Sequence, residues 1–246
     1  MSISYLRSCT LRLKLPGGHG TGYDWDMARV RVKICGITRP EDAAAACGRG
    51  ADAIGLVFDA AQARYVPIDR AREIIAALSP FVTPVGLFVN TAAQAILDTT
   101  ATLGIRTVQL NGEETPEFVA ELAGLSVIRA IRVIRGQLQQ SLAIWREQRP
   151  PNLIGVVLEP GGTKVPGGSG VANDWEEVIS AQRAGAFGEI PVIAAGGLKP
   201  ETVAQVVREV QPYAVDVSSG VESALREKSE EKIGAFIQAV RSVNAV

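Results

Sequence analysis

Apolar and polar residues follow one repeating pattern along the chain from Val30 onward. A short apolar run rich in β-branched residues ends at a glycine or a polar residue, and a segment with the apolar periodicity of a helix follows it. Strands that alternate with helices in this way predict a parallel sheet. The expected strands span residues 30–35, 53–58, 84–89, 107–110, 127–133, 153–158, 191–195 and 214–218, and the expected helices span residues 40–48, 68–78, 92–103, 116–122, 138–146, 200–210 and 230–243, with another helix beginning at residue 174.

Eight strand–helix units in about 215 residues predict a fold of the α/β class. The expected architecture is a single (β/α)8 TIM barrel near the lower end of the size range of that fold. An open doubly wound sheet would have fewer strands and usually a nucleotide-binding fingerprint after the first strand. The Gly-Ile-Thr-Arg-Pro segment at 36–40 is not such a fingerprint. No linker interrupts the series, so one barrel domain is predicted over residues 27–246.

Residues 1–26 differ from the rest of the chain. They contain Pro-Gly-Gly-His-Gly at 16–20, show no clear period, and lack the continuous apolar core of a secretory signal. Met27 stands just before the first expected strand. We interpret this stretch as a loose N-terminal extension or as the product of a start codon assigned too early, with a transit peptide as the weaker alternative. His19 then lies outside the folded body.

Composition narrows the function classes. The 246 residues carry a formal net charge of -1, so no basic field indicates a nucleic acid or an acidic membrane surface as partner. No apolar run is long enough to span a bilayer. The three cysteines make no metal-type spacing and fit a reducing cytoplasm, while a single histidine excludes a multi-histidine metal site. We therefore expect a cytoplasmic protein without nucleic-acid or membrane partners.

The first expected strand carries candidate chemistry at its end. Alternation places Lys33 and Cys35 on one face and Val32 and Ile34 on the other. An ammonium group two residues from Cys35 predicts a lowered thiol pKa and a larger thiolate fraction. The alternative is that Cys35 is only a small buried apolar residue. Thr38 is expected to cap the helix that follows.

In a (β/α)8 barrel the chemistry lies at the C-terminal ends of the strands. Glu159 closes the sixth apolar run, where it is a catalytic carboxyl, an ion-pair partner or a solvated strand end. The other polar strand ends are Arg64 in the second loop, Gln109 and Asn111 on one face of the fourth strand, and Asp216 on the eighth.

Two glycine-rich strand ends indicate a phosphate site. Gly196 and Gly197 follow the seventh strand, and Ser218, Ser219 and Gly220 follow the eighth. Backbone N–H groups there suit an anion, at the position where this fold commonly binds phosphate. The alternative is ordinary turn chemistry. The glycine-rich loop at 160–170 is either a loop that closes over a substrate or a long surface loop.

Several motifs occur in an order that resembles one enzyme family. They are Lys33-Ile34-Cys35-Gly36-Ile37-Thr38, Arg64-Tyr65-Val66, Gly86-Leu87-Phe88-Val89-Asn90, Gln109-Leu110-Asn111-Gly112, Ala195-Gly196-Gly197-Leu198 and Asp216-Val217-Ser218-Ser219-Gly220-Val221-Glu222. From about Val30 to Val243 the chain resembles the phosphoribosylanthranilate isomerases of tryptophan biosynthesis, which are TIM barrels of the phosphate-binding type.

The resemblance implies an Amadori rearrangement of N-(5'-phosphoribosyl)anthranilate to the corresponding 1-deoxyribulose phosphate, without a metal or organic cofactor. It also implies that Cys35 is the general base and that Arg64 contacts the anthranilate carboxylate. Glu159 stands where the family has its aspartate general acid, and Asn111 stands where the family has a histidine. The further expected substrate-binding residues are Lys33, Gln109, Asn111 and Asp216, with phosphate at Gly196, Gly197, Ser218, Ser219 and Gly220.

Two other functions stay open at this point. One is another sugar-phosphate barrel enzyme, such as an epimerase, although the metal-dependent epimerases of this architecture use histidines, which the folded body lacks. The other is a barrel that binds a phosphorylated metabolite without turnover, against which the pairing of Cys35 with a carboxyl at position 159 argues. The expected partner is a small phosphorylated substrate, and the sequence does not distinguish a monomer from a homodimer.

Overall fold

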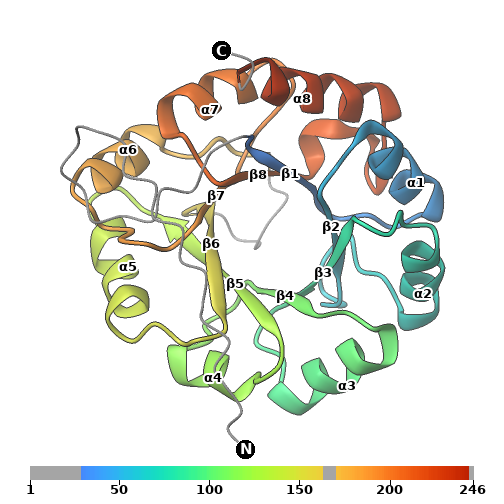
Figure 1. Cartoon of the computed structure of the whole chain (residues 1–246), viewed down its shortest axis with the longest axis horizontal. Helices are drawn as coiled ribbons and strands as arrows, with labels where there is room; N and C mark the ends of the chain where they lie inside the picture. Colours follow the sequence, from blue (N-terminus) through green and yellow to red (C-terminus); the bar gives the residue numbers. More distant parts are fainter. Residues whose placement is uncertain (1–28, 163–169, 244–246) are drawn as a thin grey trace, which may run out of the picture.

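The structure, a computed structural model, describes residues 29–162 and 170–243. Eight parallel strands pair in chain order and close into a barrel, because β1 pairs with β8 (Figure 1). The predicted (β/α)8 fold is therefore confirmed. The strands are β1 (Arg31–Ile34), β2 (Ala53–Val57), β3 (Thr83–Phe88), β4 (Thr107–Leu110), β5 (Ser126–Val133), β6 (Leu153–Pro160), β7 (Val192–Ala194) and β8 (Ala214–Val217).

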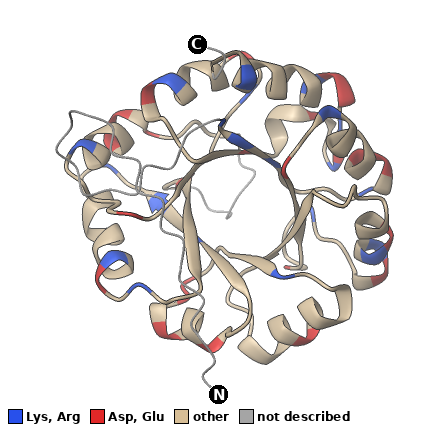
Figure 2. Cartoon of the chain, in the orientation of Figure 1, with Lys and Arg blue, Asp and Glu red and all other residues tan. Residues whose placement is uncertain are grey.

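Helices form a ring around the barrel, and residues of both charge signs are interspersed along this ring (Figure 2). Within the described ranges, no helix is both long and apolar enough to cross a bilayer. The helices are α1 (Pro40–Arg49), α2 (Ile68–Ala76), α3 (Ala93–Leu103), α4 (Pro116–Glu121), α5 (Leu138–Glu147), α6 (Trp175–Arg183), α7 (Val203–Val210) and α8 (Glu230–Val243).

Two predictions fall on residues that the structure does not describe. The N-terminal extension at 1–26, with His19, lies outside the described residues. The same is true of residues 163–169 within the glycine-rich loop.

The apolar residues form two layers, as the alternation along the strands requires. Val32 and Ile34 belong to the layer between the strands and the helices, whereas Cys35 belongs to the layer inside the barrel. Lys33 is also buried, so the predicted division of faces along β1 is confirmed. The buried residues of the inner layer are Cys35, Val57, Val85, Leu87, Ile128, Ala130, Val157, Ile193, Ala195 and Ala214.

Two element boundaries differ from the prediction in ways that affect the barrel mouth. β6 continues through Glu159 and Pro160, which pair in register with Arg132 and Val133 of β5. Glu159 thus sits in a paired strand, so its backbone is fixed rather than free to move with the loop. α7 begins at Val203, three residues later than expected, because the N–H of Thr202 donates to the Lys199 carbonyl and closes a turn first.

The predicted cap of α1 is wrong. The N-cap residue is Arg39, which offers no side-chain cap and instead binds the Asp42 carboxylate at 2.7 Å. The Thr38 hydroxyl donates to the Arg226 carbonyl at 2.6 Å. Pro40 at the first helical position makes a cap less necessary, because it has no N–H to satisfy.

The pattern also missed a small addition after β8. A 3₁₀ turn (Ser219–Val221) leads into an antiparallel hairpin of β9 (Glu222–Ala224) and β10 (Glu227–Lys228). These strands are very short and carry no apolar alternation, which is the signal that identifies a strand in a sequence. The hairpin lies beside the barrel mouth and contributes to the site described below.

We expect α8 to be part of the cooperative core. Phe236 on α8 is fully buried, and α8 packs against α1, α7 and β1. Phe236→Ala should lower the free energy of unfolding by about 3–5 kcal/mol, because it removes a large buried side chain and leaves a cavity. Urea denaturation measures this loss.

The matched control is Phe81→Ala, since Phe81 is 96% exposed in the loop between α2 and β3. That substitution should change the free energy of unfolding by less than about 0.5 kcal/mol. Equal losses in the two variants would contradict the assignment of α8 to the core.

Candidate active site

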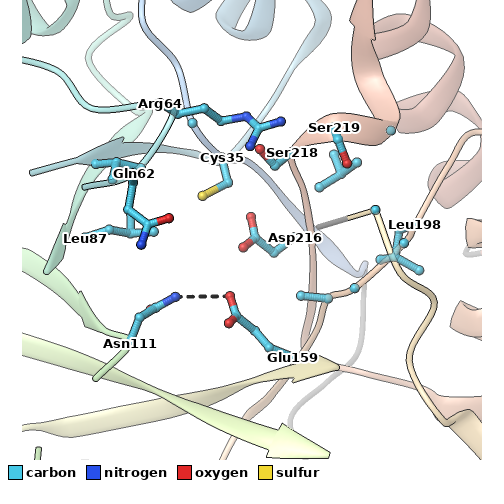
Figure 3. Close-up of a pocket in the computed structure, with 18 of the residues that line it drawn as sticks. Cys35, Gln62, Arg64, Leu87, Asn111, Glu159, Leu198, Asp216, Ser218 and Ser219 are labelled. Atoms are coloured by element: carbon cyan, nitrogen blue, oxygen red, sulfur yellow. Dashed lines mark hydrogen bonds between the residues drawn. The ribbon is translucent and has the colours of Figure 1, made fainter. Parts of the chain in front are cut away.

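A cavity of about 310 Å³ opens at the C-terminal ends of the strands (Figure 3). Most of the predicted site residues line it, and they come from several strand ends and loops. Lys33 and Gln109 do not line the cavity, but each binds a residue that does. The predicted residues in the lining are Cys35, Arg64, Asn111, Glu159, Gly196, Gly197, Asp216, Ser218, Ser219 and Gly220.

A buried ion pair lies below the cavity. Lys33 Nζ donates to Asp216 Oδ2 at 2.9 Å, across the β1–β8 pair that closes the barrel. Burial opposes the charge of Lys33, but the nearby Asp216 and Cys35 still hold the pKa of the ammonium above its ordinary value. The second carboxylate oxygen of Asp216 has no hydrogen-bond partner in the described part of the chain. Asp216 therefore neutralises Lys33 and keeps one acceptor available.

The predicted thiolate of Cys35 is not what the structure favours. Cys35 is only 8% exposed, and burial together with the negative charge of Asp216 raises the pKa of its thiol. Lys33 and Lys228 act in the opposite direction without prevailing. The prediction counted the ammonium of Lys33 but not the carboxylate that neutralises it, so it was wrong about the net direction. Cys35 is a buried residue of the inner layer and also a cavity-lining thiol.

Glu159 projects into the cavity from a side different from Cys35, and Asp216 lies nearby (Figure 3). Burial, and then the charge of Asp216, raises the pKa of the Glu159 carboxyl. Asn111 Nδ2 donates to Glu159 Oε1 at 3.1 Å, and Gln109 Nε2 donates to Asn111 Oδ1 at 3.0 Å. This chain of amides holds one carboxyl oxygen of Glu159, so the other oxygen is the one that can carry a proton.

The two glycine-rich strand ends approach each other closely. Gly197 adopts a φ of +63°, and a Cβ there would lie 2.6 Å from Ala172. A Cβ on Gly220 would overlap the Leu198 carbonyl oxygen. Asn173 ties this region to β6, because its Nδ2 donates to the carbonyls of Leu158 and Ala195 at 3.0 and 3.1 Å. The absence of side chains lets these segments pack together, and both Gly197 and Gly220 line the cavity.

Arg64 belongs to a charged cluster at the rim. Its Nε and Nη2 each donate to Glu222 at 2.7 Å, in the two-pronged geometry that suits a carboxylate. Lys228 Nζ donates to the same carboxylate at 3.0 Å. Burial disfavours the charge of Glu222, yet the bonds from Arg64 and Lys228 hold its pKa below the ordinary value.

Sequence reasoning gave no role to Glu222 or Lys228. Glu222 closes one of the motifs quoted above. That was a usable signal, because a carboxylate that the fold buries next to a strand end needs a cation as partner. Lys228 had no such signal. It comes ten residues after Ser218, and only the fold brings its side chain back to Ser218, which lines the cavity.

The chain is similar to known proteins along nearly all of its described length. A model of the N-(5'-phosphoribosyl)anthranilate (PRA) isomerase family matches residues 32–239. The N-(5'-phosphoribosyl)anthranilate isomerase of Pseudomonas fluorescens (strain SBW25) is 45% identical over 217 residues, which cover 88% of this chain and 98% of that protein.

Solved structures agree with this match. The crystal structure of phosphoribosyl anthranilate isomerase from Thermotoga maritima is 35% identical, with a TM-score of 0.77 over 87% of this chain and 99% of that one. A phosphoribosyl anthranilate isomerase in complex with reduced 1-(o-carboxyphenylamino)-1-deoxyribulose 5-phosphate is 34% identical, with a TM-score of 0.74 and the same coverage. The resemblance seen in the motifs is thereby confirmed, and the chain belongs to the N-(5'-phosphoribosyl)anthranilate isomerase family.

Proposed function

We propose that this chain isomerises N-(5'-phosphoribosyl)anthranilate to 1-(2-carboxyphenylamino)-1-deoxyribulose 5-phosphate, with Glu159 as general acid and Cys35 as general base. The observation that carries the proposal is the placement of a thiol and a carboxyl on different sides of one cavity with glycine-rich strand ends at its edge. The reaction needs one acid and one base on opposite sides of the sugar. No metal or organic cofactor takes part in the proposed steps.

The first step opens the sugar ring. Glu159 gives its proton to the furanose oxygen while the bond from that oxygen to C1 breaks, and the nitrogen lone pair forms a C1=N double bond. The raised pKa of the Glu159 carboxyl favours the protonated form that this step requires. The Asn111 contact to Oε1 directs the proton of Oε2 toward the cavity.

The second step moves a proton from carbon. Cys35 removes the C2 proton, and the electron pair of that bond forms the C1=C2 bond of an enolamine while the nitrogen becomes neutral. The enolamine then tautomerises to the ketone. This step needs the thiolate, whose formation burial opposes and Lys33 and Lys228 favour.

The two anionic groups of the substrate have separate proposed contacts. The phosphate lies at Gly196 and Gly197 and at the turn of Ser218, Ser219 and Gly220. The carboxylate lies at Arg64, whose guanidinium is held in place by Glu222. The ligand named for the related complex carries both a carboxyphenyl group and a phosphate, which supports a cavity with two anion contacts.

We further propose that the protein acts in the cytoplasm, as a monomer or a homodimer, on this small phosphorylated substrate alone. Complementation of a tryptophan auxotroph tests the activity against the two alternatives. Growth is expected. A failure to grow, together with tight product binding by the purified protein, would favour the non-catalytic barrel.

Both catalytic groups should be essential. Cys35→Ala removes the base, and Glu159→Gln keeps the shape of the acid without its proton. Each should lower kcat by at least about a hundredfold while affinity for the product changes little. Steady-state kinetics and calorimetry with the product measure both quantities.

Cys47→Ser is the matched control, because Cys47 lies on α1 away from the cavity. The kcat of this variant should stay within about twofold of that of the unmutated protein. Turnover by Glu159→Gln at the unmutated rate would remove the acid role.

Glu159→Asp should lower kcat even though aspartate is the acid of the resembled family. Shortening the side chain withdraws the carboxyl from Asn111, which now lies 3.1 Å away, and a misplaced donor costs about tenfold or more. Adding Asn111→Gln lengthens the amide and should restore part of the rate. The double-mutant cycle in kcat measures this coupling. If aspartate raises the rate on its own, the pocket is not adapted to glutamate.

Gly197→Asp should abolish binding of phosphorylated ligands, because its side chain would meet the backbone of Ala172 and displace this strand end, and it adds a negative charge beside the proposed phosphate site. Gly185→Asp is the control, since Gly185 has a similar φ of +70° and a Cβ there would meet nothing within 4 Å. Calorimetry with the product compares the two variants. Normal affinity in folded Gly197→Asp would place the phosphate elsewhere.

A further inference from the structure

The β9–β10 hairpin is hydrogen-bonded to the loop that carries Arg64. Arg226 donates from its two Nη atoms to the carbonyls of Ala63 and Tyr65, at 3.0 and 3.1 Å. Glu222 at the start of the hairpin binds the Arg64 guanidinium itself. The hairpin therefore fixes the backbone on both sides of Arg64 as well as its side chain.

Lys228, the last residue of β10, is hydrogen-bonded to the proposed phosphate-binding turn at Ser218. Lys228 has a fully buried side chain, and its Nζ donates to the Ser218 carbonyl at 3.0 Å and contacts Ser218 Oγ at 3.4 Å. Its third contact is the Glu222 carboxylate at 3.0 Å. A buried ammonium is costly unless its donors are satisfied, and these three acceptors satisfy them. Lys228 thus connects the turn at Ser218 to the carboxylate that holds Arg64.

The charges of this cluster do not cancel. Arg64, Lys228 and Glu222 together carry two positive charges and one negative charge, which leaves one positive charge beside the cavity. The other ammonium near the thiol, Lys33, is neutralised by Asp216. Lys33 lowers the pKa of the thiol more than Lys228 does, but Asp216 offsets it, so the positive charge without a matching carboxylate belongs to the cluster.

Charged groups from several elements act on the Cys35 thiol. Asp216 on β8 disfavours the thiolate, whereas Lys33 on β1 and Lys228 on β10 favour it. Arg64 in the loop after β2 also interacts with Cys35. Of these cations, Lys228 is the one that belongs to an unbalanced cluster and also touches the phosphate turn.

We propose that Lys228 is a positioning residue that sets the electrostatic environment of Cys35 and holds the Ser218 turn in the geometry that receives phosphate. It acts through Cys35 and Ser218 and does not touch the reacting atoms. The inference rests on the proposed function only for the role of Cys35 as base, because thiol reactivity and phosphate binding are measured without turnover.

The test is the pH dependence of Cys35 alkylation by iodoacetamide, followed by mass spectrometry of the peptide that contains Cys35. Lys228→Met should move the midpoint of alkylation to higher pH and slow the reaction at neutral pH about tenfold, since it removes a nearby positive charge. Lys228→Arg keeps the charge and should stay close to the unmutated protein. Affinity for inorganic phosphate, measured by calorimetry, should fall about fivefold in Lys228→Met, because the turn loses its anchor.

Glu222→Gln tests the direction in which the pH midpoint of Cys35 alkylation moves. It leaves Arg64 and Lys228 uncompensated, so the midpoint should move to lower pH, opposite to Lys228→Met. A purely structural role would move both variants in the same direction. Arg72→Met, which removes an exposed cation paired with Asp69 on α2, should leave the midpoint unchanged.

The proposal is wrong if folded Lys228→Met, checked by near-ultraviolet circular dichroism, alkylates and binds phosphate as the unmutated protein does. It is also wrong if Lys228→Met and Glu222→Gln shift the midpoint in the same direction. A Cys35→Ala variant that kept its turnover would instead overturn the base assignment, and the alkylation result for Lys228 would still stand.

Discussion

The ion pair of Lys33 and Asp216 is the constraint on which the site depends. It spans the one seam of the barrel where the first and last strands meet, and both side chains are buried. Removing one partner of a buried pair leaves an uncompensated charge and typically costs about 3–5 kcal/mol. Asp216 also lies in the cavity lining, so the contact that helps to close the barrel lies directly beneath the proposed chemistry.

Asp216 acts on both proposed catalytic groups. Its negative charge raises the pKa of the Cys35 thiol and of the Glu159 carboxyl, in addition to burial. This suits an acid, which must hold its proton, and works against a base, which must lose one. The base therefore depends on positive charge from elsewhere. Lys33 supplies part of it, and the cluster of Arg64, Glu222 and Lys228 adds to it from the loop after β2 and the hairpin after β8.

The sequence predicted what depends on local periodicity. The repeat of strands and helices led to the barrel, and alternation placed Lys33 with Cys35 and Gln109 with Asn111, which are hydrogen-bonded in the structure. Predictions failed where a distant partner decides the outcome. The thiol pKa was misjudged because Asp216 is far from Lys33 in sequence, and Thr38 does not cap α1 because its hydroxyl binds Arg226. No periodicity reveals that the side chain of Lys228 folds back onto Ser218.

The position of Glu159 shows how strand length and side-chain chemistry combine. Its backbone belongs to β6 and is paired with Arg132, so the carboxyl cannot reach a partner by loop movement and must do so by side-chain length. Asn111, directly after β4, offers a short amide, and the longer glutamate spans the remaining gap across the barrel mouth. Gln109 then fixes the orientation of that amide from below. The side chains of Asn111 and Gln109 thus position the carboxyl of Glu159, and a substitution at any of these three residues alters the placement of the proton that the carboxyl donates.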